Sequence, residues 1–124
     1  MRAMTHPLLL VAFGGAIGAV LRALAAQWLA RDGFPVATLA VNVTGGLAIG
    51  LLAGLAARGG LGAWQPLLIT GVLGGFTTFS AFSLETVAFL EAGTVAMAAL
   101  YVGASVGLSA GAAMLGLALA RGLA

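Results

Sequence analysis

The chain has 124 residues, of which 62% are hydrophobic and only 6% are charged. Because soluble domains carry about 25% charged residues, this composition could not cover a water-facing surface and predicts a membrane protein. Five arginines, three acids and no lysine form no run of like charge, which argues against a nucleic-acid partner. The absence of cysteine excludes disulfides and thiolate metal sites.

Four apolar stretches are long enough to cross a bilayer as helices, a task that takes roughly 20 residues. They cover residues 8–29, 36–57, 64–90 and 94–120, and short segments rich in glycine or charge separate them. The first stretch continues past a possible signal-peptide cleavage site, so we expect an uncleaved span. The sequence therefore predicts an all-α membrane protein with a single four-helix transmembrane domain over residues 1–124.

The arginines are nearly balanced between the two sides of the membrane. Arg2, Arg58 and Arg121 fall on one side, and Arg22 and Arg31 fall on or toward the other. This weak bias is consistent with a chain that inserts in both orientations, so that two copies pair antiparallel about an axis in the membrane plane. The alternative is that charges are simply scarce.

Glycines recur every four residues on three of the predicted spans, a pattern that lets helix backbones approach closely in lipid. These stripes are Gly14 and Gly18, then Gly46, Gly50 and Gly54, and finally Gly103, Gly107 and Gly111. Four thin helices enclose little volume, so we expect a continuous polar pathway to need a second chain.

The third span contains an unusual run of glycine, hydroxyl and phenylalanine residues, Gly71 to Ser83. Thr77 lies about 20 Å from the start of this span, just past the centre of a hydrocarbon layer of roughly 30 Å. A helix break near the Gly74–Gly75 pair would free carbonyls that suit Na⁺ and amides that suit an anion. The alternative is an unbroken helix whose threonines bond back to earlier carbonyls.

Further polar and aromatic residues lie within the predicted spans, where such groups usually serve function. Phe79 and Phe82 share a helix face and are either core filler or ring edges that contact an anion. Asn42 offers an amide donor, and Tyr101, Ser105 and Ser109 make a hydroxyl stripe about 12 Å long. No combination of side chains typical of catalysis is present, so we do not expect an enzyme.

Arg22 and Glu85 are the charged residues inside the predicted spans. Arg22 either extends toward the interface or attracts anions at a pore mouth. Pairing of Arg22 with backbone carbonyls or with Glu85 would shape a vestibule without contact to a permeant ion.

Three sequence blocks resemble the Fluc, or CrcB, family of fluoride channels. They are residues 14–22, 38–45 and 71–85, in that order. The resemblance implies an antiparallel, dual-topology homodimer with two passive fluoride pores, in the plasma (inner) membrane of the cell. Export of fluoride through these pores would reduce its toxicity in the cytoplasm.

The same resemblance implies particular sites. A central Na⁺ would be held by the backbone carbonyls of Gly74 and Thr77 from both subunits. The implied pore residues are Asn42, Phe79, Ser80, Phe82, Tyr101, Ser105 and Ser109, with Arg22 and Glu85 at the family's charged positions. Ala81 departs from the family pattern, which commonly has a hydroxyl residue there.

Two other functions are compatible with four small spans. A proton-coupled multidrug exporter would need a carboxylate in its first span, but that span contains Arg22 and no acid. A non-transporting assembly subunit would use only the glycine stripes.

Overall fold

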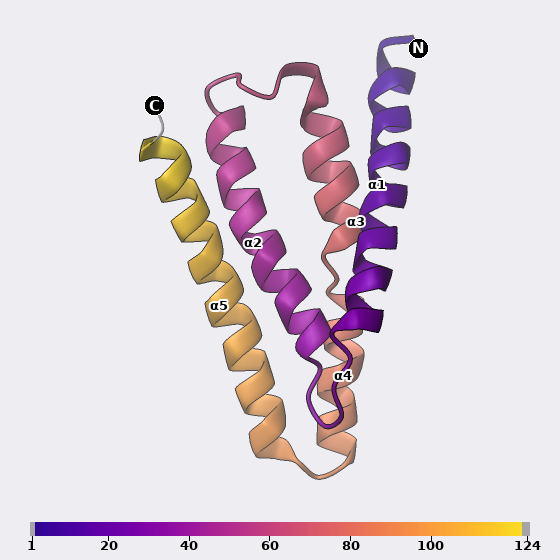
Figure 1. Cartoon of the computed structure of the whole chain (residues 1–124), viewed down its shortest axis with the longest axis vertical. Coiled ribbons are helices and arrows are strands. Elements are labelled where there is room, and N and C mark those ends of the chain that lie inside the picture. Colours follow the sequence, from indigo (N-terminus) through magenta and orange to yellow (C-terminus); the bar gives the residue numbers. More distant parts are fainter. Residues whose placement is uncertain (1, 123–124) are drawn as a thin grey trace.

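The computed structural model describes residues 2–122 as helices joined by short loops (Figure 1). The three uninterrupted helices are α1 (Arg2–Trp28), α2 (Val36–Ala56) and α5 (Val95–Gly122). Including the composite segment between α2 and α5, four stretches are long and apolar enough to cross a membrane: residues 6–28, 36–56, 62–91 and 95–122. The prediction of an all-α, multi-pass membrane protein with four spanning segments is confirmed.

The segment between α2 and α5 changes helix type along its length. It begins with the 3₁₀ turn η1 (Gly62–Trp64) and the π-helix η2 (Pro66–Leu73), followed by the short α3 (Gly74–Phe76). Thr77 then adopts an extended conformation, with φ −81° and ψ 155°, before α4 (Ser80–Glu91) begins. The ribbon between α3 and α4 narrows accordingly in Figure 1.

Successive segments run in opposite directions, so α1 begins and α5 ends at the same end of the molecule, on opposite sides of it (Figure 1). The loop from α2 to η1 lies at this same end, where the Arg58 guanidinium donates a hydrogen bond to the carbonyl of Ala120 near the end of α5. The α1–α2 loop and the α4–α5 turn lie at the opposite end. This arrangement places Arg58 and Arg121 at one end and Arg31 at the other.

The turn from α4 into α5 is set by local backbone chemistry. Gly93 has a φ of 78°, and its N–H donates to the carbonyl of Leu90, while the N–H of Thr94 donates to Phe89. This pair of bonds is a Schellman motif, in which glycine avoids the Cβ strain of a left-handed residue. Helix α4 therefore ends sharply and α5 returns beside it.

Glycines on α1 allow close contact with the composite segment. A Cβ on Gly18 would collide with the carbonyl oxygen of Val72 and lie 2.7 Å from the nitrogen of Phe76. Gly75 is equally constrained, because a Cβ there would collide with the carbonyl of Gly15 and lie 3.0 Å from the nitrogen of Ala19. Backbone therefore packs on backbone where α1 crosses α3.

The other two glycine stripes differ in their surroundings. Gly46, Gly50 and Gly54 face α5, and a Cβ at each of them would collide with that helix. In contrast, a Cβ at Gly103, Gly107 or Gly111 would meet no atom within 4 Å. The stripe on α2 therefore packs within the chain, whereas the stripe on α5 faces away from the described residues.

The most buried large side chain is Tyr101, which is 0% exposed. Its ring contacts Phe82, Phe34 and Phe89, with centroids 5.2, 5.5 and 5.9 Å away. Other large apolar side chains point outward, among them Leu9 at 68% exposed. Such a surface suits lipid rather than water.

Candidate functional site

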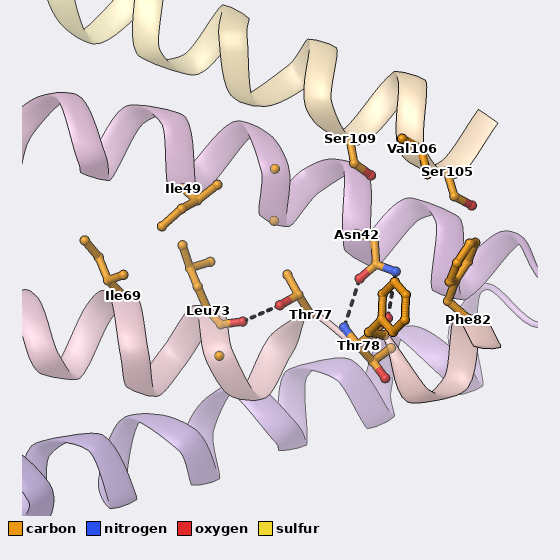
Figure 2. A pocket seen from close by; sticks show the side chains of 14 residues that line it. Asn42, Ile49, Ile69, Leu73, Thr77, Thr78, Phe82, Ser105, Val106 and Ser109 are labelled. Atoms are coloured by element: carbon orange, nitrogen blue, oxygen red, sulfur yellow. Dashed lines mark hydrogen bonds between the residues drawn. The ribbon is translucent and has the colours of Figure 1, made fainter. Parts of the chain in front are cut away.

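Asn42 connects α2 to the interruption between α3 and α4. Its Nδ2 donates to the carbonyl of Thr78, and the N–H of Thr78 donates to its Oδ1, both at 2.9 Å (Figure 2). The side-chain amide thus replaces the peptide partner that a continuous helix would have offered Thr78. One Nδ2 hydrogen remains outside this pair of bonds. The expected pore asparagine therefore also supports the extended backbone.

The two threonines at the interruption make different bonds. The Thr77 hydroxyl donates back to the carbonyl of Leu73 at 2.8 Å, the local bond expected for threonine in a continuous helix (Figure 2). The helix nevertheless stops there. The Thr78 hydroxyl accepts from the N–H of Ala81 at 3.2 Å and lies 3.3 Å from the Ser80 hydroxyl. The Thr78 hydroxyl therefore satisfies one free N–H in the first turn of α4, as a capping side chain does.

An open cavity of about 480 Å³ lies beside the interruption. Seven of the predicted site residues line it: Asn42, Gly74, Thr77, Phe79, Phe82, Ser105 and Ser109. Figure 2 shows α5 supplying the two serines from one side and the composite segment supplying the threonines from the other. The tertiary structure thus brings together residues that are up to 67 positions apart in sequence, as 42 and 109 are.

The two serines of this cavity have unused hydrogen-bonding capacity. Ser105 is 6% exposed, and its Oγ finds no hydrogen-bond partner among the described residues, nor does the Oγ of Ser109. A buried hydroxyl without a partner costs free energy, so such groups usually form hydrogen bonds to a ligand or to water. Both donors lie on the wall of the cavity, where a small anion would satisfy them.

Phe79 and Phe82 adjoin one another at the start of α4. Their ring centroids are 5.4 Å apart and the ring planes are inclined by 50°. Phe82 is 9% exposed, whereas Phe79 is 78% exposed. One ring is therefore anchored in the aromatic cluster, and the other projects from the chain beside the cavity.

Glu85 lies one turn beyond Phe82 and accepts two hydrogen bonds. Thr38 Oγ1 donates to Oε1 at 2.8 Å, and the Tyr101 hydroxyl donates to Oε2 at 2.5 Å. Tyr101 thus directs its hydroxyl to the carboxylate and does not line the cavity with Ser105 and Ser109. Three helices, α2, α4 and α5, converge on this one carboxylate.

Arg22 lies on α1 and donates from Nε to the carbonyl of Gly75 at 3.0 Å. Of the partners considered for it from sequence, the structure places it on a backbone carbonyl and not on Glu85. Ser80 is exposed, and Ser83 donates back to the carbonyl of Phe79 at 2.8 Å. The predicted pore residue Ser80 does not line the cavity, and neither does Ala81 or Ser83.

Sequence reasoning missed Thr78. The family resemblance implies a site at Thr77, yet Thr78 makes both bonds to Asn42, and its hydroxyl accepts from the N–H of Ala81. A threonine directly before an apolar helical run is a typical capping signal and could have identified it.

A cation at this site would meet neutral oxygens, because the lining of the cavity contains no carboxylate. Among residues 2–122, no three His, Asp or Glu side chains gather into a possible metal site. The available groups are carbonyls for a cation, and hydroxyls, an amide and ring edges for an anion.

The fold and the cavity together define a small four-span membrane protein whose third spanning segment is interrupted beside hydroxyl and amide groups. Residues 9–117 match the family model described as CrcB-like protein, Camphor Resistance (CrcB). The chain therefore belongs to the CrcB family.

Curated relatives match the chain over almost its whole length. A protein of Roseobacter denitrificans is 53% identical over 94% of this chain and 96% of its own length. One from Rhizobium johnstonii is 52% identical, covering 94% and 97%, and one from Paracoccus denitrificans is 49% identical, covering 97% and 98%. All three carry the name fluoride-specific ion channel FluC.

Proposed function

We propose that this protein is a fluoride-specific ion channel that lets F⁻ leave the cell down its gradient and so limits fluoride toxicity. It acts by passive transport and not as an enzyme. The observation that carries the proposal is the match of about half of all residues, over nearly the full chain, to proteins with that name. The cavity supports it, because its polar side chains are hydroxyls and an amide that can donate to an anion.

The ion path runs along the cavity wall. Fluoride is small and strongly hydrated, so a selective pore must replace its water with closely spaced donors. The unpartnered hydroxyls of Ser105 and Ser109 and the remaining Nδ2 hydrogen of Asn42 provide such donors on the cavity wall. The exposed Ser80 hydroxyl, which is outside the lining, extends the path beyond the cavity. The ring edges of Phe79 and Phe82 carry partial positive charge and contact the ion between them. Tyr101 and Glu85 shape the end of this path.

The working unit is an antiparallel homodimer of dual topology. A single chain leaves the cavity open on one side and Phe79 78% exposed, so a second copy is needed to close the pore. The near balance of arginines between the two ends permits insertion in both orientations. Because the proposed channel lets F⁻ leave the cytoplasm, we place it in the plasma (inner) membrane.

The carbonyls of Gly74 and Thr77 from both subunits would hold a central Na⁺. The site fits a hard cation, because both residues line the cavity and no carboxylate competes there. When bound, the ion would supply positive charge at the carbonyl end of the interrupted helix.

Fluoride and chloride efflux from liposomes tests the function. Purified protein should release F⁻ rapidly and Cl⁻ hardly at all, and comparable Cl⁻ release would contradict the proposal. The same vesicles test the multidrug exporter, which would take up a quaternary cation in exchange for protons. Helix α1 contains no acid for such an exchange, and both oxygens of Glu85 already accept hydrogen bonds.

A further inference from the structure

The carbonyls around the interruption divide into those that accept a hydrogen bond and those that do not. Leu73 accepts from the Thr77 N–H and hydroxyl, Gly75 accepts from Arg22, and Thr78 accepts from Asn42. Among the described residues, none donates to the carbonyls of Gly74 or Thr77. The two unbonded carbonyls are those assigned above to the cation.

The bonded and unbonded groups also face different neighbours. Gly75 lies against α1, where its own Cβ position would meet the backbone of Gly15 and Ala19. Gly74 and Thr77 line the cavity instead, and Gly75 does not. The interruption therefore has one face toward α1 and another toward the cavity.

Arg22 occupies the face toward α1. It lies four residues after Gly18 and so on the same side of the helix, where the missing Cβ lets Val72 and Phe76 approach. This close contact brings the guanidinium to the C-terminal end of α3, where carbonyls lack partners and a cation is favoured. The arginine side chain is long enough to extend from α1 to the Gly75 carbonyl, and its planar guanidinium holds the donor in a fixed direction.

We propose that Arg22 is a positioning residue for the cation site. By holding the Gly75 carbonyl on the α1 side, it fixes the end of α3 so that the carbonyls of Gly74 and Thr77 point into the cavity. It acts through this backbone and does not contact the permeant ion. The inference rests on the proposed Na⁺ site and assigns to that site a residue that lies outside the cavity wall.

Sodium titration of the purified protein tests this role. The unfolding temperature would be measured as Na⁺ is added to a sodium-free buffer, for the unchanged protein, Arg22→Met and Arg22→Lys. Arg22→Met removes charge and donor at similar length, and it should raise the half-saturating Na⁺ concentration about tenfold or more, as expected for loss of a charged hydrogen bond. Arg22→Lys should give a smaller rise.

Arg31→Gln is the matched control, because Arg31 is exposed and, among the described residues, its side chain bonds to the carbonyl of its neighbour Ala30 and to no other group. It should leave the titration unchanged. A purely structural role for Arg22 would lower the unfolding temperature at every Na⁺ concentration without moving the half-saturation point, and this result would overturn the inference. If Arg22→Met does not fold, an unaltered half-saturation point in Arg22→Lys, with an unaltered preference for Na⁺ over Li⁺, would overturn it equally.

The titration separates this inference from the proposed function. If the unfolding temperature of the unchanged protein did not respond to Na⁺, both the proposed cation site and the role of Arg22 would be contradicted. Absence of fluoride efflux would remove the channel function but leave the sodium titration interpretable.

Discussion

Asn42 and Thr78 form a reciprocal pair in which a side-chain amide substitutes for a peptide group across two helices. Both bonds measure 2.9 Å, and together they satisfy the backbone of a residue that belongs to neither α3 nor α4. Non-helical backbone at membrane depth persists only where protein groups satisfy it. This pair therefore accounts for how an interruption survives within an apolar segment.

Asn42→Asp should sharply reduce fluoride flux. The aspartate keeps an acceptor for the Thr78 N–H but places an oxygen against the Thr78 carbonyl, which loses its donor. Such a loss costs about 1–3 kcal/mol, and a negative charge beside the path also repels an anion. Fluoride efflux from liposomes should fall at least about tenfold.

Gln27→Glu provides the control for this change, because it makes the same amide-to-acid replacement at an exposed position of α1. It should retain most of the flux. Equal loss in both variants would trace the effect to charge in the membrane and not to the Asn42–Thr78 pair.

Phe79→Ile should reduce flux without unfolding the chain. The ring is 78% exposed, so its replacement removes little packing within the subunit, yet it removes the ring edge proposed to contact fluoride. We expect a flux reduction of at least about tenfold, a change of roughly 1.4 kcal/mol in the barrier. Phe13→Ile is the matched control, since Phe13 is 67% exposed on α1. Efflux that is the same in both variants would contradict a pore role for Phe79.

Tyr101→Phe should lower stability. The ring is retained among Phe34, Phe82 and Phe89, but Glu85 Oε2 loses the hydroxyl that bonds to it at 2.5 Å. A half-buried carboxylate oxygen left without this donor should cost about 1–3 kcal/mol, measured as a lower unfolding temperature in detergent. Combining Tyr101→Phe with Glu85→Gln should cost less than the sum of the single changes, and strict additivity would show that the two side chains are not coupled.

Gly18→Ala should destabilise the contact of α1 with η2 and α3. The added methyl would collide with the Val72 carbonyl, and backbone cannot move aside as a side chain can. Overpacking of this kind costs about 1–3 kcal/mol, visible as a lower unfolding temperature. Gly107→Ala adds the same methyl to open space and should be nearly neutral. Similar losses at both positions would attribute the effect to glycine replacement in general.

The composition alone determined the class of protein, because a chain with 6% charged residues has too few polar groups to face water. Local pattern determined the helices and their turns, such as the one at Gly93, where a single glycine and its neighbours decide the backbone. The run from Gly71 to Ser83 likewise indicated a break in the third segment, because glycine and hydroxyl residues weaken a helix locally.

Only the tertiary structure decided which groups meet. Spacing by four made Gly50 and Gly107 look equivalent, yet the first packs on α5 and the second faces away, because small-residue periodicity does not specify a partner. Thr38 and Tyr101 both bond to Glu85, although they lie 47 and 16 residues from it in the sequence. From sequence, Arg22 could have paired with backbone carbonyls or with Glu85, and the structure places it on the carbonyl of Gly75. Long-range contacts depend on how whole helices cross, and the close approach at Gly18 is what brings Arg22 to Gly75.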